Sequence, residues 1–356
     1  MLRTMTLGKP AAKGARLEFD FLIVDNYLRD VTQARALKTA FELGLVDRLL
    51  EKSPAAAPEL STALRIEPRG LQFLLDLLLG AAVLDRASGG YRLHARFLQA
   101  LAFRDLLEAK LDFAGFVAAD LIDLFTGAIA DPAGFQQRSR LFHLFDYRRC
   151  LEPTHANYEH TRRWMRLTSA LTRYEARACL QAHDFAGARR LLDVGGNSGE
   201  FALQACRAHA ALTATVFDLP LVCEIGAEHL LPHAERERIA FLPGDLRRDP
   251  LPAGRDLVSF KSVLHDWPEA ETLRFLDAAV AALAPGGTLL IFERLPLDVT
   301  GHAPGFGLLP ALLFFRSYRP AAFYRDALAA RGLEGLQVQE VPLDVPFLLV
   351  TGRKRA

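Results

Sequence analysis

A glycine-rich turn at Leu191–Ala202, with the sequence LLDVGGNSGEFA, is the first segment whose residues are suited to ligand binding. An apolar strand is predicted to run into the glycines and a helix to follow them. Backbone N–H groups and the helix N-terminus would then face a ligand at the carboxyl edge of a sheet. An ordinary strand-to-helix turn has the same pattern, so the glycines alone are weak evidence of a nucleotide-like ligand.

Three carboxylates lie at the ends of three consecutive predicted strands: Asp193, Asp218 and Asp245. The strand ends of a doubly wound sheet converge on one crevice, so we expect these side chains to lie close together. Asp218 can accept hydrogen bonds from both hydroxyls of a ribose. The alternative role of Asp218 is a helix cap before Pro220, and the alternative role of Asp245 is in a turn. The cluster favours a cofactor with a cationic end and no phosphates.

A histidine is predicted at the same edge of the sheet. His265 follows the fourth predicted strand, and an imidazole with a pKa of about 6.5 can take a proton from a hydroxyl near neutral pH. Glu293 ends the next predicted strand, where it can orient the imidazole and stabilise its charged form. The alternatives are a core or turn role for His265 and a capping box formed by Asp266 and Glu269.

The second half of the chain supplies the elements that would align these residues. After Gly187, short apolar strands alternate with helices, which indicates βαβ units and a parallel sheet. We expect an α/β fold with a Rossmann-like, doubly wound, mostly parallel sheet and an antiparallel C-terminal strand. The predicted strands are Arg190–Val194, Ala214–Phe217, Ile239–Leu242, Leu257–Phe260, Thr288–Phe292, Leu336–Val341 and Phe347–Gly352, the last two as a terminal hairpin after a helix at Ala321–Ala330.

The first half, from Phe19 to about Leu180, is predicted to be mostly α-helical. Helices at 35–43, 58–64 and 69–84 and a wing at 88–93 form a winged-helix pattern. The third helix is apolar nearly all round and has only Arg69 to contact phosphate, so we expect it to be buried against protein rather than bound to DNA. The predicted domains are a helical winged-helix domain over 1–185 and a sheet domain over 186–356.

The composition agrees with a two-domain cytoplasmic enzyme. The 356 residues exceed one ordinary domain, and 43 basic against 42 acidic side chains exclude a globally basic nucleic-acid binder. The four cysteines are far apart and lie in no zinc-like cluster, so neither disulfides nor a metal is predicted. Met1–Arg16 has no apolar core of a signal peptide, and no apolar run is expected to span a membrane.

Taken together, the motifs resemble those of S-adenosylmethionine (SAM)-dependent O-methyltransferases of the caffeate, acetylserotonin and bacterial polyketide-tailoring type. The most specific segments are Leu192–Gly196, Phe217–Pro220, Gly244–Asp245, Leu264–Trp267 and Ala284–Gly287. The resemblance implies methyl transfer from SAM to a hydroxyl of a small aromatic or polyketide-like acceptor, with S-adenosylhomocysteine (SAH) as product and no metal. It also implies a homodimer formed through the N-terminal half.

The resemblance assigns roles to individual residues. His265 matches the catalytic base, with Asp266 beside it, and Glu293 matches one of two acids that orient the base. Met165 matches a methionine that clamps the substrate ring. The residues matched to the cofactor site are Asp193, Gly195, Gly196, Asp218, Leu219, Asp245, Leu246, Lys261 and Ser169. An apolar acceptor pocket between the two halves is predicted to be lined by Phe142, Phe145, Tyr147, Met165 and Leu308–Phe315.

Two positions depart from the family pattern. Asn197 follows Gly196 where a third glycine is usual, and asparagine tolerates left-handed backbone. The second orienting acid normally precedes an Arg-Thr pair, and we assign Ser317 to its place. His265 would then depend on Glu293 alone, which leaves methylation at carbon and a catalytically silent SAM-binding relative as alternatives.

Two further classes of protein stay open. A winged-helix regulator that senses a ligand would need salt-sensitive DNA binding, which the apolar third helix and the charge balance disfavour. A nicotinamide oxidoreductase would need the full Gly-x-Gly-x-x-Gly pattern, but Asn197 and Glu200 occupy its third and sixth positions when counting begins at Gly195.

Overall fold

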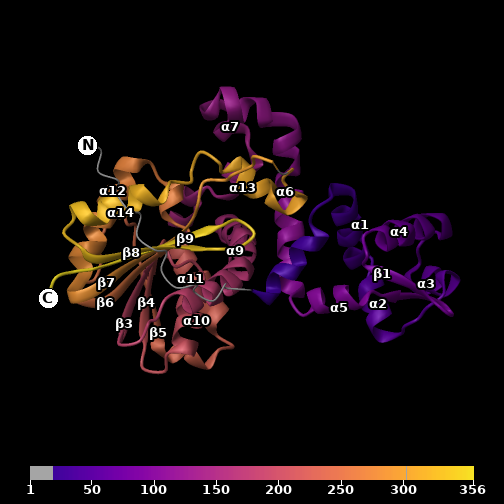
Figure 1. Ribbon diagram of the computed structural model, residues 1–356, viewed down its shortest axis with the longest axis horizontal. Helices are drawn as coiled ribbons and strands as arrows, with labels where there is room; N and C mark the ends of the chain where they lie inside the picture. Colours follow the sequence, from indigo (N-terminus) through magenta and orange to yellow (C-terminus); the bar gives the residue numbers. More distant parts are fainter. Residues whose placement is uncertain (1–18, 302) are drawn as a thin grey trace, which may run out of the picture.

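The computed structural model describes residues 19–301 and 303–356, so the expectation for Met1–Arg16 lies outside the described residues. A large sheet occupies one end of the molecule and a group of small helices occupies the other (Figure 1). Helix α6 (Arg104–Ala130) lies between these two regions. The division into domains at residue 185 stays a prediction.

The sheet has seven strands in the order β5-β4-β3-β6-β7-β9-β8. Strands β3 to β7 pair in parallel, and β9 runs antiparallel to both of its neighbours. The predicted doubly wound sheet with a reversed C-terminal strand is therefore confirmed. The strands are β3 (Arg190–Val194), β4 (Thr213–Asp218), β5 (Ile239–Pro243), β6 (Arg255–Lys261), β7 (Leu283–Arg294), β8 (Glu334–Val341) and β9 (Phe347–Arg353).

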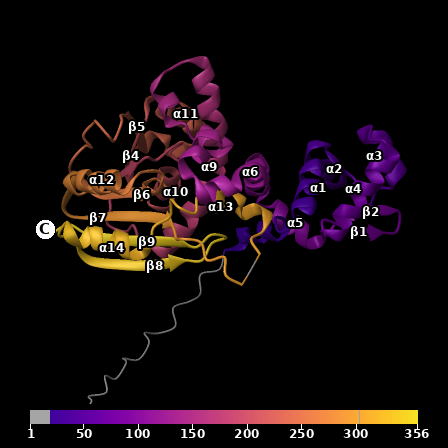
Figure 2. The same ribbon diagram turned by 90° about the horizontal axis from the view of Figure 1, so that it is seen from above.

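Both faces of the sheet are buried because successive side chains of each strand point to opposite sides. Leu191 packs in one core cluster with Phe201, whereas Leu192 packs in a second cluster with Phe275 and Leu328. The first cluster includes Ala202 and Ala205, and the second includes Leu276 and Ala327, which belong to different helices. Figure 2 shows the sheet and its helices from a second direction. The helices around the sheet are α9 (His155–Ala182), α10 (Glu200–Ala208), α11 (Pro220–Leu230), α12 (Glu269–Ala282) and α14 (Ala321–Ala330).

The small helical region has the predicted winged-helix order, but its third helix is shorter than expected. Helix α4 ends at Gly80; Ala82 has a positive φ of 51°, and Leu84 already begins the wing. The helix is not buried all round either, since Phe73 is 67% exposed while Leu75 is buried. The elements are η1 (Asp20–Tyr27), α1 (Val31–Glu42), α2 (Leu45–Glu51), α3 (Ala57–Leu64), α4 (Pro68–Gly80), β1 (Leu84–Ala87), β2 (Gly90–Leu93) and α5 (Ala95–Leu101).

Helix α6 corrects the expectation that no segment could span a membrane, because by length and composition alone it passes that test within the described residues. The buried polar side chain of Asp120 in helix α6, however, forms hydrogen bonds within the protein. Asp120 is buried and accepts hydrogen bonds from Ser139 Oγ (2.6 Å) and Leu141 N (3.0 Å). The helix packs on α9 and on three short elements near the sheet edge, α7 (Pro132–Arg138), α8 (Arg140–Leu144) and α13 (Leu309–Leu313).

Candidate active site

The glycine turn lies between β3 and α10, as predicted. Gly195 and Gly199 have positive φ values of 68° and 74°, and Asn197 adopts the left-handed conformation at 55°. A Cβ on Gly195 would lie 2.7 Å from the side chain of Val263, and one on Gly196 would lie 2.5 Å from Asp193 Oδ2. Only glycine fits at these two positions, and asparagine keeps the turn at the third.

Asp193 is a buried carboxylate with one free oxygen. Its Oδ1 accepts a hydrogen bond from Ser259 Oγ at 2.7 Å, whereas Oδ2 has no partner among the described residues. Burial raises the pKa of Asp193 to about 7. An unpartnered buried acceptor at a cavity wall is suited to an ammonium group, because leaving it unpaired is costly.

Asp218 does not cap helix α11, so that alternative is wrong. Its Oδ2 accepts from the Asn197 N–H at 2.8 Å and its Oδ1 from the Leu219 N–H at 2.7 Å, which ties strand β4 to the glycine turn. Burial raises the pKa of Asp218 to about 6. The side chain lines a cavity together with Leu219, Gly244, Asp245, Leu246 and Trp267.

Asp245 is also at this cavity, but it is held in an ion pair. Both of its carboxylate oxygens accept hydrogen bonds from the Arg247 guanidinium, each at 2.8 Å. Hydrogen bonds from Arg247 hold the pKa of Asp245 below its ordinary value. The sequence therefore placed Asp218 and Asp245 in the same crevice correctly, whereas it gave no signal for the arginine partner.

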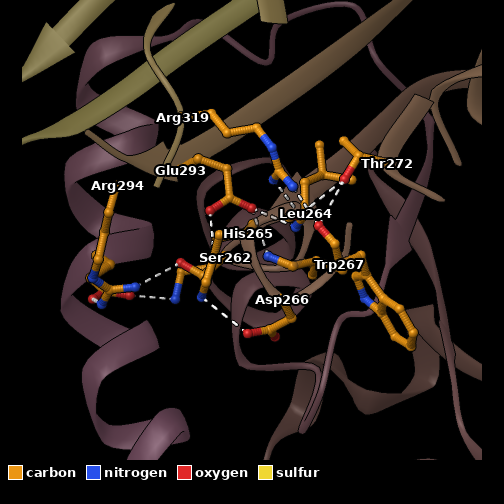
Figure 3. Close-up of polar contacts among 12 residues, drawn as sticks. Ser262, Leu264, His265, Asp266, Trp267, Thr272, Glu293, Arg294 and Arg319 are labelled. Carbon is orange, nitrogen blue, oxygen red and sulfur yellow. Dashed lines mark hydrogen bonds and ion pairs between the residues drawn. The ribbon is translucent and has the colours of Figure 1, made fainter. Parts of the chain in front are cut away.

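His265 and Glu293 form a buried polar pair of the site (Figure 3). His265 Nδ1 lies 2.7 Å from Glu293 Oε2, and Glu293 Oε1 accepts from the N–H groups of Val263 and Leu264 at 2.7 Å each. His265 Nε2 lies 3.4 Å from Asp266 Oδ1. Burial lowers the pKa of His265, but the two carboxylates outweigh burial and raise that pKa above its ordinary value.

Asp266 does not form the predicted capping box. Helix α12 begins at Glu269 with no side-chain cap, and Asp266 Oδ2 instead accepts a hydrogen bond from the Tyr147 hydroxyl at 2.7 Å. Tyr147 comes from η2 (Tyr147–Leu151), which lies far from Asp266 in sequence. This bond brings the helical segment onto the wall of the site.

Tyr318, rather than Ser317, is the residue that lies beside the imidazole of His265. The Tyr318 ring lies 5.6 Å from the imidazole, centroid to centroid, and Tyr318 is buried. The Ser317 side chain makes no contact with His265 that the structure records, although its backbone N–H bonds to Phe314 O. The assignment of Ser317 to the place of the second acid is therefore corrected to Tyr318, which immediately precedes Arg319.

Lys261 borders the same cavity as His265, as predicted, within a buried charge network. Its Nζ donates to Thr172 Oγ1 at 2.8 Å and forms an ion pair with Glu175, which also binds Arg294. Sequence reasoning missed Glu175 and Arg294. A carboxylate in the interior of helix α9 was the available signal.

The larger cavity has an aromatic wall and lies against Asp193, Gly195, Gly196 and His265. Phe145 and Tyr147 line it as predicted, but Phe142 packs on Phe135 and Phe314 and is not among its lining residues. Met165 is buried in a neighbouring apolar cluster and Ser169 binds Ser198 Oγ, so neither reaches the cavity. Lining residues that the sequence did not single out include Phe21, Lys110, Phe113, Trp164, Tyr318 and Asp344.

The two cavities meet along a shared wall. The residues that line both are Tyr147, Trp164, Gly195, Asn197, Ser262 and Asp266. One cavity therefore holds Asp218 and Asp245, the other holds His265, and a ligand in the first can face a ligand in the second. No cluster of three or more His, Cys, Asp or Glu side chains suited to a metal is found within 19–301 and 303–356.

Comparison with known proteins agrees with this arrangement. An O-methyltransferase domain matches residues 137–314, and an O-methyltransferase dimerisation domain matches residues 26–102. A 3-hydroxy-5-methyl-1-naphthoate 3-O-methyltransferase of Streptomyces sahachiroi is 31% identical over 271 residues, which is 75% of each chain. Mouse acetylserotonin O-methyltransferase is 28% identical over 364 residues, 91% of this chain and 87% of that protein. The chain belongs to the SAM-dependent O-methyltransferase family.

Solved structures share the fold of this O-methyltransferase. Human N-acetylserotonin methyltransferase in complex with SAM matches with a TM-score of 0.73 at 22% identity, covering 97% of this chain and 100% of that one. The SAM-dependent methyltransferase SibL matches with a TM-score of 0.65 at 26% identity, covering 91% and 96%. The site fits SAM as cofactor, since the free Asp193 oxygen suits its ammonium group.

Proposed function

We propose that this methyltransferase moves a methyl group from SAM to a hydroxyl of a small aromatic or polyketide-like acceptor, with His265 as general base. The observation that carries the proposal is that His265, held by Glu293 at 2.7 Å, lines a cavity that shares a wall with the cavity of Asp218. SAM supplies an electrophilic methyl on a positively charged sulfur. The protein has to place the acceptor oxygen and remove its proton.

His265 is suited to that proton transfer. Glu293 holds Nδ1, so Nε2 is the nitrogen available to the acceptor hydroxyl, and Asp266 stands beside it. The acceptor O–H bond would break, its proton would pass to Nε2, and the oxygen would keep the electron pair that forms the new bond to the methyl. The methyl–sulfur bond would break at the same time, and its electron pair would leave with SAH. Glu293 then stabilises the imidazolium, and a positioned base of this kind typically adds about 10²–10⁴-fold to a rate.

The cofactor would be held by residues at the strand ends. Asp218 is proposed to bind the ribose hydroxyls, with Leu219 beside it, and Asp245 and Leu246 to flank the adenine. The glycines of the turn, Asp193 and Lys261 would surround the methionine part. Ser169 would support this end indirectly through Ser198, to which it bonds at 2.7 Å.

The acceptor would lie between Phe145, Tyr147 and Phe314, whose rings face the cavity with His265. Aromatic walls of this kind bind flat apolar rings well and supply large contact area. The clamp expected from Met165 would act only through Trp164, its buried neighbour in the same cluster.

We also propose a cytoplasmic homodimer that binds neither nucleic acid nor membranes. The matched dimerisation domain and the exposed Phe73 on α4 support a protein-facing winged helix. Light scattering on the purified chain tests this, and a monomer would contradict it.

The test of the activity uses methyl-deuterated SAM, a panel of phenols and hydroxyquinones, and mass spectrometry. A product that gains a deuterated methyl on oxygen, together with SAH, supports the proposal. Methylation on carbon, or SAH binding without turnover of any acceptor, would replace it by one of the two alternatives named above.

A further inference from the structure

Tyr318 is the neighbour of the imidazole for which the proposed mechanism has no role so far. Its ring is 8% exposed, lies 5.6 Å from the His265 ring at an angle of 56°, and lines the larger cavity. Phe314 stands on the same segment, 6.0 Å from the imidazole at 80°. Two aromatic rings from one segment therefore enclose the imidazole, while Glu293 holds its Nδ1.

This segment is attached directly to the loop that carries His265. The Arg319 guanidinium donates to Leu264 O at 2.8 Å and also to Trp267 O, the carbonyls on either side of His265 and Asp266 (Figure 3). A side chain that precedes such an anchor is fixed relative to the imidazole. Tyr318 is thus placed by covalent connection to Arg319 and by packing, without a bond to the imidazole nitrogens.

The charges around His265 come from other elements. Asp266 on η4 (Leu264–Asp266) and Glu293 and Arg294 on β7 are the charged groups that act on it, and Tyr147 on η2 faces it through Asp266. Tyr318 adds no charge, because burial raises the pKa of its hydroxyl above the ordinary value. Tyr318 therefore places an aromatic ring, rather than a charged group, beside the imidazole.

We propose that Tyr318 is a positioning residue for the base: its ring, and not its hydroxyl, keeps the imidazole aligned between Glu293 and the acceptor cavity without adding a third carboxylate to Glu293 and Asp266. This rests on the proposed role of His265. The type of residue at position 318 also affects the pKa of His265. A carboxylate there would lie within the range at which it raises the pKa of a histidine.

Removal and rescue of the ring test the positioning role. Tyr318→Ala should lower kcat about tenfold or more, because small misplacement of a reacting group is costly, with the affinity for SAH unchanged by calorimetry. Tyr318→Phe should restore kcat to within about twofold of the parent. A Phe variant as slow as the Ala variant would overturn the proposal by assigning the effect to the hydroxyl, and an Ala variant with parental kcat would overturn it outright.

A matched pair of acidic variants tests the place of Tyr318 independently of activity. The pKa of His265 is followed by NMR, with its signal identified by its loss in His265→Gln. Tyr318→Glu should raise this pKa by about one, whereas Ser317→Glu on the adjacent residue should leave it unchanged. The reverse result, or no change in either variant, would contradict the proposal.

The two proposals fail in different ways. If His265→Ala turns over acceptor at the parental rate, the base role falls even when Tyr318→Glu shifts the pKa of His265. If His265→Ala is inactive but Tyr318→Ala keeps the parental kcat and Tyr318→Glu leaves the pKa of His265 unchanged, the base role stands and the positioning role falls.

Discussion

The two cavities of this methyltransferase are built in different ways. The cavity with Asp218 and Asp245 is formed mainly by residues at or just after the carboxyl ends of β3, β4, β5 and β6, so most of its wall is placed by neighbouring strands. The cavity with His265 draws on Phe21, Lys110, Tyr147, Phe314 and Asp344, which are spread over most of the chain. Local sequence therefore specifies the first cavity, and long-range packing specifies the second.

The contrast extends to what holds each cavity together. Asp218 binds backbone N–H groups of its own and the neighbouring turn. In the other cavity, Lys110 on α6 is buried and binds Asp25 Oδ1 at 2.5 Å and Asp344 Oδ2 at 2.7 Å, joining η1, α6 and the β8–β9 loop. Changes at Lys110 should thus affect the acceptor side and leave the cofactor side intact.

The largest expected effect concerns His265, the proposed base in the larger cavity. His265→Ala should reduce single-turnover methyl transfer by about 10²–10⁴-fold, because the acceptor proton loses its positioned acceptor. SAH affinity should stay within about twofold, since other residues are proposed to hold the cofactor. Rapid-quench assays and calorimetry measure the two quantities, and an unchanged transfer rate would remove His265 from the chemistry.

Next in size is the effect of the buried lysine. Lys110→Met removes the buried cation that Asp25 and Asp344 share. Because these two side chains are 30% and 25% exposed, the free energy of unfolding should fall by about 1.5–3 kcal/mol. Urea denaturation measures this, and the triple variant that also carries Asp25→Asn and Asp344→Asn is the control that should recover part of the loss. Equal losses in the single and triple variants would show that the charges are not responsible.

A change at Asp218 tests the proposed role of its cavity in cofactor binding. Asp218→Ala removes the proposed ribose acceptor and the anchor of the Asn197 N–H, so the affinity for SAH should fall about 10–100-fold while the protein keeps its fold. Calorimetry with SAH measures the affinity, and circular dichroism checks the fold. Parental affinity in this variant would place the ribose elsewhere.

The smallest expected effect is on pH dependence. His265 must be neutral to accept a proton, so kcat/KM rises with pH through its pKa, which Asp266 and Glu293 hold above the ordinary value. Glu293→Gln removes one of these charges and should move the acidic limb of the profile to lower pH by about one. A limb that moves to higher pH would contradict the assigned electrostatics.

The sequence was most informative where function depends on neighbours along the chain. The strands, the glycine turn, Asp218, Asp245 and the proximity of His265 and Glu293 followed from strand periodicity and from the convergence of parallel strand ends. The arrangement of Phe142, Met165 and Ser317 did not, because a helical or loop side chain can face the cavity or the core with the same local pattern. Ser317 and Tyr318 differ by one position, and packing decided between them.

By itself, then, the sequence determined the class of fold, the cofactor and the strand end at which His265 lies, since these depend on motifs within single strand-turn-helix units. Only the tertiary structure decided which side chains enclose His265 and line the larger cavity. Tyr147, Lys110 and Tyr318 reach the cavity from three separate segments, and their contacts with Asp266, Asp344 and His265 span long stretches of chain. Such contacts depend on how the helical half packs against the sheet, and no local pattern encodes that packing.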